Sequence, residues 1–329
     1  MGRKRVLSGM RPTGRLHLGH CFGALQNWVR LQDEYECFFM VADWHALTSE
    51  WQDTSEICPM ARQMVIDWLA VGLDPAKCTI FVQSQVKQHA ELALILGMFT
   101  PLPWLERCPT YKEQIEQVKN RDLSNFGFLG YPVLQAADIT LYDAAAVPIG
   151  EDQLTHLEMT REMVRRINFI YREVLVEPQP ILSPTPRLLG LDGRKMSKSY
   201  GNAIYLSDPP EVVAQKVREM VTDPARVRRQ DPGNPDVCNV FSYQKLLSPD
   251  KLEWIEGGCR TAAIGCVDDK KLLTERLNVL LEPIRARRRE IEAAAGLVER
   301  VLEEGNARAR DVAESTMRRV RKALKLFEG

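Results

Sequence analysis

Apolar positions in the first half of the chain fall into short continuous runs. These runs are Val6-Leu7, Cys37 to Ala42, Thr79 to Val82 and Val147 to Ile149. Runs of this length, bounded by polar and turn-forming residues, are typical of strands that are buried on both faces. They predict the strands of a parallel sheet.

Between these runs the apolar residues recur at helical spacing. A helix is expected to start near Leu18, because apolar residues continue every three to four positions as far as Val29. Another is expected through Met64 to Leu69 and ends at Gly72, and a third from about Glu151 to Tyr171. Strands that alternate with helices predict an α/β fold class.

The second half of the chain has a different pattern. After the proline-rich stretch Pro178 to Pro186, strand signals almost disappear, and from Pro209 onward the segments are helical. Leu281 to Leu326 is rich in Ala, Arg, Glu and Leu and predicts long helices. We therefore expect an α/β domain over 1–200 and an α-helical C-terminal domain over 201–329, whose last helix could pack back on the first domain.

Length and composition narrow the class of protein. The 329 residues are enough for two hydrophobic cores. The longest apolar runs are too short to cross a bilayer, and no signal-peptide core follows the basic residues at Met1 to Arg5. The sequence predicts a cytoplasmic protein with no membrane partner.

Charge is balanced overall but clustered locally. The net charge of +0 argues against a general basic coat for nucleic acid. Basic residues nevertheless gather in three places: Arg226, Arg228 and Arg229; Arg285, Arg287, Arg288 and Arg289; and Arg318, Arg319, Arg321 and Lys322. Each cluster fits either a solvated helix face or a nucleic-acid contact.

The segment Ser8 to His20 reads SGMRPTGRLHLGH and joins the first strand to the first helix. Ligands collect at the carboxyl ends of parallel strands, and a helix N-terminus offers free N–H groups to an anion. His17 and His20 are three residues apart, so both rings lie on one face of the first turn. His20-Cys21 stands where a P-loop needs Lys and Ser or Thr, which excludes that nucleotide site.

A second cationic loop, RKMSKS, lies at Arg194 to Ser199. Lys195 and Lys198 are separated by small hydroxyl-bearing residues, and such a loop can fold over a triphosphate. Nucleotidyl transfer needs positive charge there, because the barrier falls when charge that develops on pyrophosphate is neutralised. Function requires the two histidines and the two distant lysines to meet around one nucleotide.

Together these segments resemble class I aminoacyl-tRNA synthetases, whose HIGH and KMSKS signatures they match as HLGH (17–20) and KMSKS (195–199). Three stretches resemble bacterial tryptophanyl-tRNA synthetases: ADWHALTS (42–49), YPVLQAADI (131–139) and GEDQ (150–153). The resemblance covers essentially the whole chain. It implies a Rossmann-type catalytic domain that ends in the KMSKS loop, a helical domain that binds the tRNA anticodon, and a homodimer.

The resemblance also implies ligands and site residues. The ligands are L-tryptophan, ATP with Mg²⁺, and tRNA(Trp). The signature residues with catalytic roles would be His17, His20, Lys195 and Lys198. ATP would be bound by Arg11, Pro12, Thr13, Gly19, His20, Gly150, Glu151, Asp152, Leu188, Lys195, Met196, Ser197, Lys198 and Ser199. Tryptophan would be bound by Asp138, Tyr131, Gln153, His45 and Gln135.

Asp138 fits its assigned role chemically. An indole N–H is a donor without an acceptor, so a buried carboxylate is a suitable partner. A phenol would also satisfy Asp138, and tyrosine therefore stays open as the substrate; the GEDQ form favours tryptophan. Arg11 and Gln135 depart from the family, where many members have Gln and Met. Two other classes remain: a small-molecule nucleotidyltransferase and a non-catalytic, synthetase-like tRNA-binding paralogue.

Eight cysteines in a cytoplasmic chain predict buried thiols and not disulfides. Cys238, Cys259 and Cys266 lie in the helical part, where some tryptophan enzymes that this chain resembles hold an iron–sulfur cluster on four cysteines. The fourth position is Asp269 here, a poorer ligand than a thiolate. Either a labile [4Fe-4S] cluster or packed thiols fits this pattern.

Overall fold

The computed structural model describes residues 2–109, 111–112, 123–150, 153–182 and 188–327. Five parallel strands form one sheet in the order β3-β2-β1-β4-β5. The strands are β1 (Arg5–Met10), β2 (Glu36–Val41), β3 (Cys78–Val82), β4 (Ala146–Ile149) and β5 (Gln179–Leu182). The α/β fold class predicted from the sequence is confirmed.

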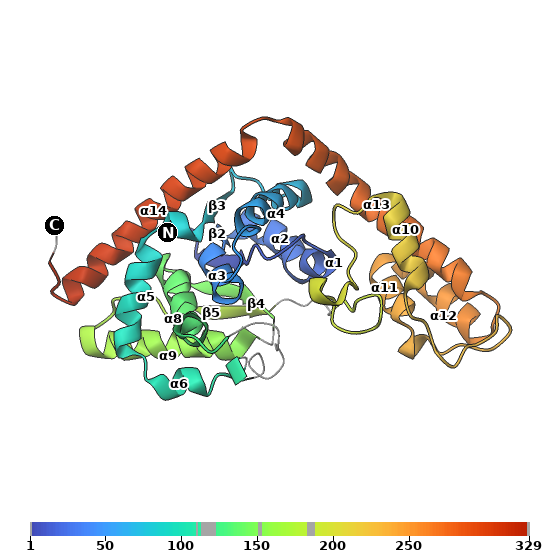
Figure 1. Cartoon of the computed structure of the whole chain (residues 1–329), viewed down its shortest axis with the longest axis horizontal. Helices are drawn as coiled ribbons and strands as arrows, with labels where there is room; N and C mark the ends of the chain where they lie inside the picture. Colours follow the sequence, from blue (N-terminus) through green and yellow to red (C-terminus); the bar gives the residue numbers. More distant parts are fainter. Residues whose placement is uncertain (1, 110, 113–122, 151–152, 183–187, 328–329) are drawn as a thin grey trace.

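Helices cover both faces of the sheet (Figure 1). Those before β4 are α1 (Leu18–His20), a π-helical turn (Cys21–Leu25), α2 (Gln26–Glu34), α3 (Asp43–Glu50), α4 (Ile57–Val71), a 3-10 turn (Gln83–Gln85), α5 (Gln88–Phe99), α6 (Leu102–Glu106) and α8 (Phe126–Leu141). Helix α9 (Leu154–Tyr171) follows β4. Adjacent strand residues face opposite sides, so that Val6 joins a core with α2 and α4 while Leu7 joins a core with α8 and α9.

The described part of the second half is helical. It contains α10 (Pro210–Glu219), α11 (Asn239–Leu247), α12 (Leu252–Arg260), α13 (Cys266–Ala293) and α14 (Leu297–Ala323), with 3-10 turns at Lys198–Tyr200, Pro235–Val237 and Pro249–Lys251. In Figure 1, α13 and α14 are two long helices that meet in an inverted V above the rest of the chain. No described helix is long and apolar enough to cross a membrane.

Helix α14 closes the open edge of the sheet at β3. A Cβ placed on Gly305 would lie 1.7 Å from the main-chain oxygen of Ile80, so only glycine allows this approach. Next to it, Asn306 Oδ1 accepts a hydrogen bond of 2.9 Å from the Val82 N–H. An edge strand with unpaired backbone groups is a site of unwanted pairing, and here the helix covers it.

The structure corrects two expectations from the sequence. β5 lies inside the proline-rich stretch where no strand was predicted; it is an edge strand, so a proline that lacks an N–H is tolerated there. In the basic cluster at 285–289, Arg285 and Arg288 are buried. Both point to the same face of α13 as Leu281 and Ile284, because these positions recur at helical spacing.

Candidate active site

One large cavity, of about 620 Å³, opens at the carboxyl ends of β1, β2 and β4. The sheet order reverses between β1 and β4, and such a switch point is where open parallel sheets bind ligands. Of the residues assigned to ligands from the sequence, this cavity is lined by Arg11, His20, His45, Tyr131, Gln135, Asp138, Gly150 and Gln153. Glu151 and Asp152 lie outside the described residues, as does the side chain of Ser199.

His17 and His20 stand side by side at the start of the first helix. Their ring centroids are 3.8 Å apart. The His17 main-chain N–H donates to His20 Nδ1 at 3.2 Å, so the proton of a neutral His20 ring sits on Nε2. His20 lines the cavity, whereas His17 lies behind it and is buried. His20 can therefore offer an N–H to a ligand oxygen.

Burial keeps both rings neutral. It lowers the pKa of His17 to about 3, with a further contribution from His20, and lowers the pKa of His20 to about 4. At neutral pH the two imidazoles are therefore uncharged donors. Positive charge for a triphosphate must come from elsewhere.

Acid should destabilise the fold through these two histidines. Their pKa is about 6.5 when unfolded, so between pH 6.5 and 4 the unfolded chain takes up protons that the folded chain refuses, and stability falls as pH falls. We expect the urea midpoint to drop more from pH 7 to pH 5 in the wild type than in His20→Gln, which cannot titrate. Equal drops in the two proteins would contradict this expectation.

The KMSKS loop lies against the loop that precedes His17. Lys198 Nζ donates a hydrogen bond to the main-chain oxygen of Thr13. A Cβ on Gly14 would lie 2.5 Å from Lys198 Cδ, so the lysine chain passes directly over this glycine. Lys195 is exposed on the same loop. Two segments almost two hundred residues apart are thus brought together.

The residues around this loop hold its shape. Asn202 is buried; its Oδ1 accepts from the Ser197 N–H at 2.8 Å, and its Nδ2 donates to Asp192 Oδ1 at 2.7 Å and to the Lys195 carbonyl at 3.2 Å. The hydrogen bond from Asn202 helps to lower the pKa of Asp192 to about 2. Leu188 and Met196, the second of which belongs to the loop itself, are buried.

Asp138 forms the charged wall of the cavity. Its side chain is 2% exposed. His45 Nε2 lies 2.7 Å from Oδ2, and Oδ1 takes contacts from His89 Nδ1 at 2.6 Å and Gln83 Nε2 at 2.8 Å. Burial would raise the pKa of Asp138, but the charge and hydrogen bonds of His45 and His89 bring it to about 2. Asp138 is therefore an ionised carboxylate in a fixed orientation.

Three residues in or beside this cavity were not predicted from the sequence. Gln83 directly follows β3, at the same edge of the sheet, which was an available signal. His89 is fully buried and its Nε2 lies 2.8 Å from Tyr142 Oη. His156 lines the cavity and is hydrogen bonded to Tyr131 Oη. All five histidines of the chain lie in or beside this one cavity.

The three cysteines of the helical part line one small cavity together with Asp269. Its volume of about 10 Å³ holds at most one water, and the side chain of Arg226 lines it as well. Arg226 Nη1 lies 3.8 Å from Cys259 Sγ, and Asp269 Oδ1 accepts from Gln244 at 2.7 Å. Among the described residues, no group of three His, Cys, Asp or Glu side chains is placed so that it could hold a metal ion. This arrangement does not fit an iron–sulfur cluster, and we do not propose one.

Comparison with known proteins agrees with this geometry. Residues 2–282 match the family model for class I tRNA synthetases of the W and Y type. The chain is 53% identical to a tryptophan–tRNA ligase of Thermotoga maritima, over 98% of this chain and 99% of the relative. It is 44% identical to a tryptophan–tRNA ligase of Aquifex aeolicus, over 98% of this chain and 100% of the relative.

A solved structure is similar over the same length. It is a tryptophanyl-tRNA synthetase from Campylobacter jejuni, complexed with ADP and tryptophan, with a TM-score of 0.88 and 31% identity, covering 98% of this chain and 100% of that one. The family model, the full-length relatives and the fold all agree. The chain belongs to the class I tRNA synthetases that include the tryptophan and tyrosine enzymes.

Proposed function

We propose that the chain activates L-tryptophan with ATP and transfers it to tRNA(Trp). The observation that carries this proposal is the ionised, buried Asp138 on the wall of a cavity that His20 of the HLGH segment also lines, while Lys198 of the KMSKS segment bonds Thr13, next to that segment. The tryptophan–tRNA ligases among its full-length relatives favour the same substrate.

Asp138 would accept the indole N–H of tryptophan. A carboxylate has about four acceptor positions, and the described partners of Asp138 occupy three of them. The remaining position belongs to Oδ2, which contacts His45. His45, Tyr131, Gln135 and Gln153 line the same cavity and would surround the rest of the amino acid.

ATP would lie along the other side of the cavity. Arg11 and His20 line that side, and Gly150 stands at the end of β4. The exposed ammonium groups of Lys195 and Lys198 would supply the charge that the neutral histidines lack, with Mg²⁺ accompanying the triphosphate. The other ATP contacts expected from the sequence stay predictions: Pro12, Thr13, Gly19, Glu151, Asp152, Leu188, Met196, Ser197 and Ser199.

The chemistry needs no covalent intermediate on the protein. An oxygen of the tryptophan carboxylate would attack the α-phosphorus, and pyrophosphate would leave with the electron pair of the bond that breaks. A ribose hydroxyl at the 3′ end of the tRNA would then attack the acyl carbon, and AMP would leave. Positioning and charge stabilisation account for such a reaction.

Two further assignments follow from the family. We propose that residues 201–329 bind the tRNA anticodon, supported by Arg228 and Arg229, which are exposed in this part of the chain.

We also propose a cytoplasmic homodimer. It is supported by an exposed apolar surface on α5 and at the start of α6: Leu94 is 64%, Met98 73% and Leu102 53% exposed.

ATP–pyrophosphate exchange across a panel of amino acids tests the proposed function. We expect exchange with tryptophan at least about 100-fold faster than with phenylalanine, because phenylalanine has no donor for Asp138 and a site built to pair a donor rejects ligands that leave it unpaired. Faster exchange with tyrosine than with tryptophan would mean that tyrosine, whose phenol can also pair with Asp138, is the substrate. Exchange with no amino acid would favour a non-catalytic tRNA-binding paralogue.

A further inference from the structure

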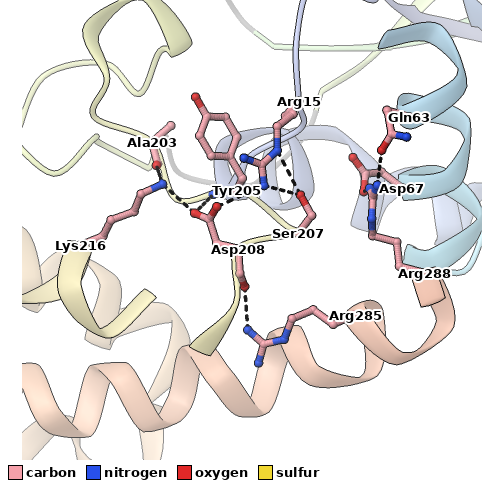
Figure 2. A network of polar contacts seen from close by, with 10 residues as sticks. All are labelled: Arg15, Gln63, Asp67, Ala203, Tyr205, Ser207, Asp208, Lys216, Arg285 and Arg288. Carbon is pink, nitrogen blue, oxygen red and sulfur yellow. Dashed lines mark hydrogen bonds and ion pairs between the residues drawn. The ribbon is translucent and has the colours of Figure 1, made fainter. Parts of the chain in front are cut away.

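Asp208 connects four separate segments of the chain (Figure 2). It follows the KMSKS loop and is 3% exposed. Its Oδ2 accepts from Lys216 Nζ at 2.7 Å and from the Tyr205 N–H at 2.9 Å, and its Oδ1 pairs with Arg15 Nη2 at 3.3 Å. Its main-chain oxygen accepts from Arg285 Nη1 at 2.9 Å. From the sequence, only Arg285 of this network was given a reading, as part of a solvated or nucleic-acid-binding cluster.

Arg15 ties Asp208 to the HLGH signature. It lies between Gly14, over which Lys198 passes, and the segment that leads to His17. Its guanidinium also donates to Ser207 Oγ at 2.7 Å and stands 4.6 Å from the centroid of the Tyr205 ring. Lys216 Nζ lies 4.6 Å from the same ring. The two cations and the carboxylate thus surround Tyr205.

The backbone pairs the same two segments. The Leu18 N–H donates to the Ile204 oxygen at 2.9 Å, and the Leu206 N–H donates to the Leu16 oxygen at 3.0 Å. Next to this short ladder, Lys198 bonds the main-chain oxygen of Thr13 and Arg15 bonds Asp208. Backbone and side-chain contacts therefore join the segment that leads into the HLGH signature to the segment that contains and follows the KMSKS signature.

Helix α13 anchors this junction to the sheet domain. Arg285 bonds Asp208, and almost one turn later Arg288 forms a buried ion pair with Asp67 of α4 and a hydrogen bond with Gln63 (Figure 2). Because both arginines point to the same face of α13, that helix holds the segment after the KMSKS loop at a fixed position relative to α4.

We propose that Asp208 is a positioning residue for adenylate formation: it sets the KMSKS loop in register with the HLGH helix start, so that Lys195 and Lys198 reach the triphosphate. It touches neither substrate. The proposal rests on the proposed function for the identity of the reaction. A misplacement of reacting groups by about 1 Å can slow a reaction on the order of 100-fold.

Asp208→Asn keeps the size of the side chain and removes its charge. We expect kcat/KM for ATP in tryptophan-dependent ATP–pyrophosphate exchange to fall about 10–100-fold. Tryptophan affinity, measured by equilibrium dialysis without ATP, should stay within about twofold, because the Asp138 side of the cavity is not touched. A merely structural role would move both readouts together with the thermal midpoint.

Arg15→Gln and Asp250→Asn complete the design. Arg15 has a half-exposed side chain, so Arg15→Gln tests the ion pair between Arg15 and Asp208 at lower risk to folding. It should show the same loss of kcat/KM for ATP. The double variant with Asp208→Asn should lose little more kcat/KM than either single variant, because both changes break the same ion pair. Asp250→Asn breaks a 2.5 Å ion pair with Arg276 on the same helix α13, away from both signatures, and should leave exchange unchanged.

Three outcomes would overturn the inference: unchanged ATP kinetics in Arg15→Gln, unchanged ATP kinetics in a folded Asp208→Asn, or an equal loss of tryptophan and ATP binding in both. If Asp208→Asn does not fold, Arg15→Gln alone decides. A wild-type protein without tryptophan-dependent exchange would overturn the proposed function itself, which is a different result from an active wild type with unaffected variants.

Discussion

Asp138→Asn is expected to raise the dissociation constant for tryptophan about 10–100-fold, because a hydrogen bond to a charged group contributes about 1.5–3 kcal/mol. The carboxylate is buried, ionised and held from three sides by His45, His89 and Gln83. Asparagine fills the same space, but its amide has one acceptor atom and must turn a donor toward a histidine or toward the indole. Equilibrium dialysis with labelled tryptophan measures the effect.

A tryptophan analogue in which sulfur replaces the indole N–H provides the control. Wild-type protein should bind this analogue much more weakly than tryptophan, whereas Asp138→Asn should bind the two ligands about equally. The comparison separates the missing hydrogen bond from any general disturbance of the pocket, since the analogue has the same shape in both proteins. If Asp138→Asn still preferred tryptophan as strongly as the wild type, Asp138 would not be the partner of the indole N–H.

The strands that the sequence predicted are those whose burial leaves a continuous apolar run. Cys37 to Ala42 is such a run, and five of the six residues of β2 are buried. β5 carries no such signal, because it lies at the edge of the sheet and contains Pro180. A single sequence indicates how buried a segment is, but not that a proline-containing stretch will add itself to an existing sheet.

Site residues that lie close together in the sequence could be predicted from it. Contacts between residues that are far apart in the sequence could not. His17 and His20 could be placed on one helical turn from their spacing alone. The partners of Asp138 could not, because Gln83 and His89 are 55 and 49 residues away in sequence. No pattern within a single chain states which distant residues will meet, although the end of β3 marks Gln83 as near the site.

The basic residues near 285–289 illustrate the same limit. Counting charges suggests a solvated or nucleic-acid-binding face for the whole run. Helical periodicity divides this run into a buried and an exposed set. Arg285 and Arg288 continue the buried positions Leu281 and Ile284, whereas Arg287 and Arg289 are exposed. What the periodicity cannot give is the acceptor of each buried guanidinium, and here those acceptors, Asp208 and Asp67, determine how the helical half is attached.

Lys198→Ala should lower kcat for tryptophan-dependent ATP–pyrophosphate exchange about 100–1000-fold, the effect expected when one preorganised group that stabilises the transition state is removed. The physical reason is that His17 and His20 are neutral, so the loop lysines must supply the charge that balances the departing pyrophosphate. Lys195→Ala should act in the same direction. Tryptophan binding without ATP should remain unchanged in both variants, since Asp138 and its partners lie on another wall.

Lys77→Ala is the matched control for Lys198→Ala. Lys77 is also an exposed lysine with a single close partner, Asp33 at 2.8 Å, but it precedes β3 at the amino edge of the sheet, opposite the cavity. Its loss should leave kcat within about twofold, because an exposed ion pair contributes little.

The separate effects of Lys198→Ala on kcat and KM distinguish two roles for this lysine. Because Lys198 also donates a hydrogen bond to the Thr13 main-chain oxygen, a rise in KM for ATP with an unchanged kcat would mean that the lysine only shapes the loop. A fall in kcat with an unchanged KM would instead place its ammonium on the transition state, as proposed.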